Sequence, residues 1–146
     1  PFRKEVNLAK GHGERGGLVQ NYSAVTAACL LVERRLYEEV GGLDEGEFRV
    51  GLNDVDFCLK LRKAGYRNLY TPFAQLLHHE SASRADMERT SAGANRAAGE
   101  NAALATKWPE YFEHDPYWNP NLSLLSEDGS LAFPPRTEVR VKNRVF

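Results

Sequence analysis

The chain has 146 residues, of which 42% are hydrophobic and 27% are charged, and its formal net charge at pH 7 is −1. This composition is typical of one soluble globular domain. The balanced charge argues against a nucleic-acid binder, and no apolar run reaches the roughly 18 residues that span a bilayer. The two cysteines, Cys29 and Cys58, lie in apolar runs, which predicts buried free thiols in a reducing, cytoplasmic compartment.

The first third of the chain predicts a loop, a strand and a short helix. Residues 1–20 are polar and glycine-rich. Their stretch 11–16 matches the pattern G-x-G-x-x-G, but no strand before it and no helix after it are predicted, so we discount nucleotide binding there. Residues 22–33 are apolar and β-branched and predict a buried strand. Residues 34–40 predict a helix that ends at Gly41-Gly42.

The most informative stretch is "NDVDFCLKLRKAG", which predicts a second helix after a glycine-punctuated loop. Asn53 is expected to cap this helix, and Asp54 and Asp56 suit the positive end of its dipole. Gly65 is expected just after its last turn.

The remainder predicts two strands and a long helix. Residues 66–72 and 74–79 predict the strands, and residues 81–108 predict an exposed helix that stops before Pro109. The proline-rich segment that follows predicts irregular structure. The tail, residues 136–146, predicts either an edge strand or the start of a further region. The order of elements indicates a mixed α/β fold.

Two groups of polar residues carry the functional signal. Acids in a first helical turn, such as Asp54 and Asp56, are ordinary structural residues when taken alone. The pair His78-His79 at the end of a predicted strand is equally ordinary when taken alone, because histidine pairs also occur on protein surfaces that have no function. Together, however, an acid at a helix start and a histidine at a strand end can converge on one crevice, which is where open α/β sheets bind ligands.

The order and spacing of several motifs resemble one known family. These motifs are "VTAACLLV", "GGLDE", "NDVDFCLKLRKAGYR", "YTP", "HHESASR" and "DPYWNPNLS". They resemble the C-terminal half of family 2 glycosyltransferases of the GT-A fold, in particular the rhamnosyltransferase-like enzymes of bacterial surface polysaccharide synthesis. The resemblance implies an α/β fold, a partial, Rossmann-like GT-A domain with a mixed sheet and flanking helices. It divides the chain into a flexible N-terminal loop (1–20), the C-terminal half of the transferase domain (21–123) and a tail (124–146).

The resemblance implies a role for each matched residue. Asp54 takes the place of the catalytic base of inverting members, which deprotonates the acceptor hydroxyl. Asn53 stands where the family usually has glutamate, which puts an acidic partner for the base in doubt. Thr26 and Asp44 would line the acceptor side with Asn53. His78 takes the place of the histidine that binds the divalent metal, Mn or Mg.

The donor side is represented less completely. Ser81, Ser83 and Arg84 follow the histidine pair, where the resemblance implies a loop over the donor diphosphate. The nucleotide-binding strands and the Asp-x-Asp metal motif of the family's N-terminal half have no counterpart in the chain. We therefore expect a fragment of an inverting, nucleotide-sugar-dependent glycosyltransferase that is inactive alone, and it is open whether this fragment holds a metal by itself.

The resemblance also implies partners and leaves two alternatives. The expected partners are a nucleotide-diphosphate sugar donor and a saccharide or lipid-linked acceptor. The expected location of the protein is the cytoplasm, peripherally at the inner face of the membrane. One alternative is a non-catalytic binding or oligomerisation module built from the same half-fold, with self-association through its exposed surface. The other is a metal hydrolase that uses Asp54, Asp56 and His78, although no further ligand cluster is visible.

Overall fold

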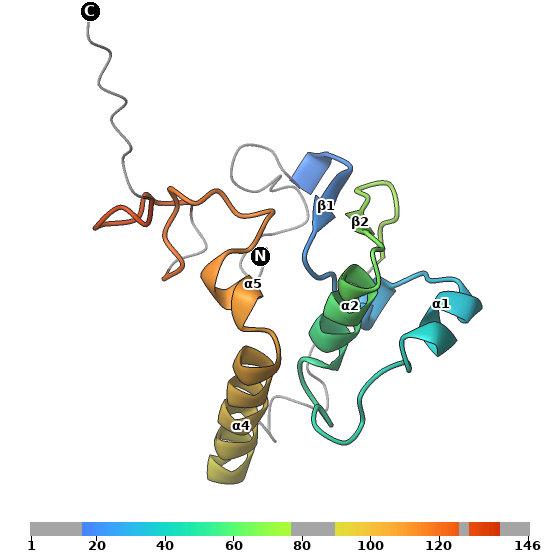
Figure 1. Ribbon diagram of the computed structural model, residues 1–146. Coiled ribbons are helices and arrows are strands. Elements are labelled where there is room, and N and C mark those ends of the chain that lie inside the picture. Colours follow the sequence, from blue (N-terminus) through green and yellow to red (C-terminus); the bar gives the residue numbers. More distant parts are fainter. Residues whose placement is uncertain (1–15, 77–89, 126–128, 138–146) are drawn as a thin grey trace, which may run out of the picture. The chain divides into compact units, whose positions relative to one another are not determined.

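The computed structural model describes residues 16–76, 90–125 and 129–137, and it shows a mixed α/β chain (Figure 1). The chain divides into two compact units, Leu18–Tyr117 and a smaller one made of residues 1–17 and 118–146. The larger unit contains, in order, β1 (Gln20–Tyr22), the 3-10 helix η2 (Ala27–Cys29), α1 (Arg34–Glu39), α2 (Asn53–Lys63), β2 (Asn68–Tyr70), α4 (Ser91–Lys107) and α5 (Pro109–Glu113).

The sheet of the larger unit is a short antiparallel pair. Strands β1 and β2 pair with Asn21 opposite Leu69, and α2 packs next to β2. The rings of Tyr22 and Tyr70 meet edge to face, 5.9 Å between centroids. The buried strand predicted over 22–33 is therefore wrong, because the chain leaves the sheet after Tyr22 and forms η2 instead. The strand predicted over 66–72 is confirmed over its middle, Asn68–Tyr70, which is β2.

Helices α1 and α2 begin and end close to where the sequence predicts. Gly42 follows α1 with φ of +61°, and a Cβ at this position would lie 2.7 Å from the Tyr37 ring, so only glycine fits. The N-cap of α2, however, is Leu52, in the left-handed conformation at φ +62°, and Asn53 is already helical. The expectation that Asn53 caps α2 is thus wrong by one residue.

The apolar core of the larger unit lies between α2, α4 and the loop that precedes α2. It consists of Phe48, Leu59, Leu104 and Trp108, all buried. Helix α4 stops before Pro109 as expected, and α5 follows at once. The start of α4 after the Thr90 cap differs from the start expected at residue 81, and residues 81–89 lie outside the described residues. The predicted full exposure of α4 is wrong, because Leu104 and Glu100 are buried.

The two cysteines differ in their surroundings. Cys58 on α2 is buried, as predicted, whereas Cys29 in η2 is exposed. The expectation of a buried Cys29 depended on the strand predicted over 22–33, and it fails with that strand. Burial also raises the pKa of the Cys58 thiol above its usual range.

This difference predicts selective alkylation. Iodoacetamide at neutral pH should modify Cys29 readily and Cys58 only in denaturant, because reaction requires an accessible thiolate. Mass spectrometry of peptides from native and unfolded protein measures both rates. Equal labelling of the two cysteines in the native protein would contradict the buried position of Cys58.

The smaller unit is held by a few contacts of its own. Leu122 and Leu131 form an isolated antiparallel bridge, and Arg136 donates to the carbonyl of Leu122 at 3.1 Å. The predicted strand over 74–79 lies partly, and the tail largely, outside the described residues. In the parts of the chain that are described, no helix is long and apolar enough to cross a membrane.

Candidate functional site

Asp54 stands in the first turn of α2 and is held by two backbone donors. Its Oδ1 accepts from the N–H of Val55 at 2.9 Å, and its Oδ2 accepts from the N–H of Ala27 at 3.0 Å. Each carboxylate oxygen has two lone pairs, so each can still accept a proton donor from a ligand. The carboxylate is therefore fixed in orientation and remains chemically able to receive a hydroxyl proton.

Thr26 directly precedes Ala27, the residue whose N–H donates to the Asp54 carboxylate. Its side chain caps η2 by accepting from the N–H of Ala28 at 3.2 Å, and the next residue, Ala27, donates to Asp54. Because the Thr26 hydroxyl accepts in this bond, it keeps its own hydrogen for donation. The structure thus brings together two of the sequence-predicted site residues, although they are 28 positions apart. Asn53, at the start of α2, lies next to Asp54 in sequence.

Asp44 has bonding of a different kind. Its Oδ1 accepts from the N–H groups of Gly46 and Glu47, both at 3.0 Å, and its Oδ2 lies 3.2 Å from Lys107 Nζ. The Glu47 N–H and the Lys107 ammonium hold the pKa of Asp44 below its usual range. These contacts show that Asp44 stabilises the turn that contains Gly46 and Glu47. Its place on the acceptor side stays a prediction.

The remaining predicted site residues lie outside the described residues. These are the predicted metal ligand His78 and the predicted diphosphate-binding residues Ser81, Ser83 and Arg84. Within the described ranges, no group of three or more histidine, cysteine or acidic side chains is placed to hold a metal. The metal and donor assignments therefore stay predictions.

A buried charge cluster around Asp56 is a feature that sequence reasoning missed. Asp56 is fully buried, and its Oδ1 accepts from the indole N–H of Trp108 at 2.8 Å. Lys107 Nζ lies 3.0 Å from the same oxygen, and Lys60 Nζ lies 3.5 Å from Oδ2. Asp56 thus has a structural role, as expected, but its partners are the side chains of Lys60, Lys107 and Trp108 rather than the helix dipole alone.

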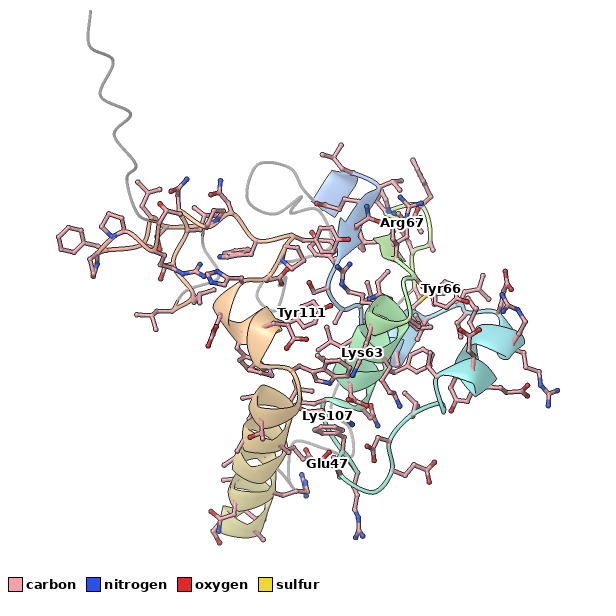
Figure 2. The ribbon with its side chains drawn as sticks, viewed as in Figure 1. Glu47, Lys63, Tyr66, Arg67, Lys107 and Tyr111 are labelled. Atoms are coloured by element: carbon pink, nitrogen blue, oxygen red, sulfur yellow. The ribbon has the colours of Figure 1, made fainter. Side chains whose placement is uncertain are left out.

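Lys107 connects this cluster to the loop that precedes α2. Burial lowers its pKa, but its hydrogen bonds to Asp56 and Asp44 outweigh this effect, so that its pKa is raised overall. Figure 2 shows Lys107 and Glu47 on neighbouring segments, and their charged groups are 3.8 Å apart. One ammonium therefore joins α4, α2 and the loop. The sequence gives no local signal for this cluster, because Trp108 and Asp56 are 52 positions apart.

Glu100 is a second buried acid. It lies on α4 and holds the loop that precedes α2. Its two carboxylate oxygens accept from the N–H groups of Val50 and Gly51, each at 3.2 Å. Gly51 comes directly before Leu52, the cap of α2. The start of α2, and with it Asp54, is thereby anchored to α4.

Comparison with known proteins places the chain beside proteins of polysaccharide synthesis. It is 48% identical over 117 residues, 80% of the chain, to an uncharacterized protein of Sinorhizobium fredii, y4gI. It is 36% identical over 138 residues, 89% of the chain, to the O-antigen biosynthesis protein RfbC of Myxococcus xanthus. It is also 42% identical over 57 residues, 39% of the chain, to an N-acetylglucosaminyl-diphospho-decaprenol L-rhamnosyltransferase of Mycobacterium tuberculosis.

These alignments cover only a small part of each relative. The chain spans 13%, 10% and 18% of the three proteins, respectively. No family model matches the chain, and no solved structure matches it. The resemblance to rhamnosyltransferase-like proteins of surface polysaccharide synthesis, predicted from the motifs, is nevertheless confirmed by the names of the second and third relatives.

Proposed function

We propose that the chain is the acceptor side of an inverting, nucleotide-sugar-dependent glycosyltransferase of family 2 and carries its catalytic base, Asp54. The observation that carries this proposal is the double hydrogen bonding of the Asp54 carboxylate at the start of α2, beside the Thr26 turn. The named relatives support the reaction class, since one is a rhamnosyltransferase and one an O-antigen biosynthesis protein.

The geometry suits general-base chemistry. A base must hold its proton-accepting atom in a fixed direction within hydrogen-bond reach of the acceptor hydroxyl. Two N–H donors fix the Asp54 carboxylate, and the exposed Thr26 directly precedes one of them, Ala27. A sugar hydroxyl that donates to Asp54 can accept at the same time from the Thr26 hydroxyl, which would orient its remaining lone pair.

The proposed reaction is a single displacement at the anomeric carbon. The acceptor oxygen forms a bond to this carbon while its proton passes to Asp54. The bond to the nucleoside diphosphate breaks on the opposite face, and the diphosphate leaves with the bonding electron pair. The configuration at the anomeric carbon is inverted.

The donor side of the proposal rests on residues outside the described ranges. His78 would bind the divalent metal, and Ser81, Ser83 and Arg84 would contact the diphosphate, whose charge the guanidinium of Arg84 complements. The metal would stabilise negative charge on the leaving diphosphate. The nucleotide site itself would belong to a larger protein that contains this chain, which agrees with the small share of each relative that the chain spans.

The proposal predicts that the 146-residue chain alone neither transfers sugar nor binds nucleotide tightly. Calorimetry with UDP, GDP and dTDP in the presence of Mn²⁺ should give dissociation constants weaker than roughly 10 μM, about −7 kcal/mol. The longer protein that contains the chain should transfer sugar from one of these nucleotides. Tight binding or turnover by the chain alone would show that the donor site has been misplaced.

A non-catalytic binding or oligomerisation module is the second candidate. It is favoured by large apolar side chains that are exposed next to the sheet, such as Leu69 at 59% and Phe73 at 84%. Such a surface fits a protein partner, including a second copy. The coding sequence upstream distinguishes the two: a Rossmann-like half with an Asp-x-Asp motif supports the enzyme, and an unrelated domain supports the module.

A further inference from the structure

The segment from Ser23 to Ala27, here called the docked segment, is held to the rest of the larger unit at every second residue. The carbonyl of Ser23 accepts from Asn68 Nδ2 at 2.8 Å. Val25 contacts Cys58 through both its N–H and its carbonyl, and the N–H of Ala27 donates to Asp54. A spacing of two is the repeat of extended backbone, in which alternate residues face the same side.

The spacing of the last two attachments matches the spacing of their partners on α2. Val25 and Ala27 are two residues apart, about 6.6 Å in extended backbone. Cys58 and Asp54 are four residues apart on a helix, about 6 Å along its axis. The docked segment can therefore lie along α2 with both attachments made at once, which fixes its register.

Cys58 makes the attachment next to the one at Asp54. Its Sγ accepts from the Val25 N–H and donates to the Val25 carbonyl, with both heavy-atom distances at 3.5 Å. This double contact needs a protonated thiol, and burial, which raises the pKa of Cys58, keeps the thiol protonated at neutral pH. Cys58 lies one helical turn after Asp54 on α2. It contacts the docked segment and is not itself one of the proposed site residues.

We propose that Cys58 is a positioning residue that sets the register of the docked segment against Asp54 and thereby the distance between Asp54 and Thr26. The expected effect of Cys58 on catalysis rests on the proposed function, whereas its expected effect on the position of the docked segment does not. If the Val25 attachment is lost, Ala27 and Thr26 can shift relative to Asp54. An acceptor hydroxyl bound between Thr26 and Asp54 would then meet a misplaced base.

The structural consequence is tested on the chain itself by amide hydrogen exchange. Two variants separate hydrogen bonding from packing. Cys58→Ser keeps a group that both donates and accepts, and Cys58→Val keeps the volume but has neither function. We expect the Ala27 amide to exchange about fivefold faster in Cys58→Val, and near the wild-type rate in Cys58→Ser. The Val55 amide, which donates to the other oxygen of Asp54, is the internal reference and should not change.

The catalytic consequence is tested in the longer protein that contains the chain. Cys58→Val should lower kcat/KM for the acceptor by roughly 10- to 100-fold, the order expected for a displaced catalytic geometry, and leave the KM for the nucleotide sugar unchanged. Cys58→Ser should recover most of this loss. Leu104→Ala, in the core between α2 and α4, is the matched control for lost stability and should leave the constants of the folded enzyme unchanged.

The outcomes decide between positioning and plain packing. Faster Ala27 exchange in Cys58→Val, with recovery in Cys58→Ser, supports the proposal. Wild-type exchange in both variants overturns it, as does equal acceleration in both, because that result reports lost fit rather than lost hydrogen bonds. If the longer protein transfers no sugar, the proposed function fails, and the exchange measurement still decides the role of Cys58.

Discussion

Replacing Asp54 by asparagine in the longer protein proposed to contain this chain is expected to lower kcat by about 10²- to 10⁴-fold, the contribution typical of a positioned general base. Asparagine has the size of aspartate but cannot accept the proton of the acceptor hydroxyl. Steady-state kinetics with the nucleotide sugar and acceptor measure kcat, and calorimetry measures donor affinity. Donor affinity should stay close to that of the wild type, because Asp54 contacts the acceptor rather than the donor in the proposed site.

The same substitution has a small expected cost in stability. Both oxygens of Asp54 accept from backbone N–H groups, and asparagine offers one oxygen and one NH₂ group. One of the two hydrogen bonds is therefore lost, at about 1 kcal/mol in the free energy of unfolding.

Asp56→Asn is the matched control for this experiment, since it changes the neighbouring acid of the same helical turn. Its effect on kcat of the folded protein should be much smaller, because Asp56 is fully buried against Trp108 and Lys107. An inactive Asp56→Asn beside a fully active Asp54→Asn would move the base by two residues. Full activity of both variants would refute the inverting mechanism and favour the binding module.

Replacing Asp56 by alanine is expected to lower the free energy of unfolding by about 3 to 5 kcal/mol, the range for breaking a buried ion pair from one side. The alanine leaves the indole N–H of Trp108 without an acceptor and removes a charge partner from Lys107 and Lys60. Because the Lys107 side chain is 32% exposed, its ammonium can regain water, which places the expected cost near the lower end. Urea denaturation followed by circular dichroism measures the difference.

Two further variants show which contact matters. Asp56→Asn keeps an oxygen for the Trp108 N–H, so its cost should be clearly smaller than that of Asp56→Ala. Glu45→Ala changes an exposed acid in the loop before α2 and should stay within about 0.5 kcal/mol of the wild type. A loss below about 1 kcal/mol for Asp56→Ala would show that the buried cluster adds little to stability.

The local elements could be predicted from the sequence where local chemistry decides them. Helix α1 ends before Gly41-Gly42, and α2 ends before Gly65, whose φ is +91°. Strand β2 lies where β-favouring residues precede Pro72, and α4 stops before Pro109. Glycine and proline act on the backbone of their own neighbourhood, so their effect is visible without knowledge of the fold.

The pairing of Asp54 with the docked segment could be predicted only in part. The motif order indicated Asp54 and Thr26 as site residues, but the bond that brings their segments together runs from a backbone N–H, that of Ala27. Every residue except proline has such a donor, so no sequence pattern marks it. The same holds for the bonds of Glu100 to the N–H groups of Val50 and Gly51.

Local sequence patterns alone predict the mixed α/β class, the positions of α1, α2 and β2, and the resemblance that singles out Asp54. Contacts between distant segments explain why residues 27–29 form a 3-10 helix rather than a strand, and why Asp56 is buried while Cys29 is exposed. Apolar and β-branched residues favour a strand, but they form one only if a neighbouring strand offers hydrogen bonds along their length. Likewise, a first-turn acid is buried only when distant side chains, here those of Lys107 and Trp108, supply its charge and hydrogen-bond partners.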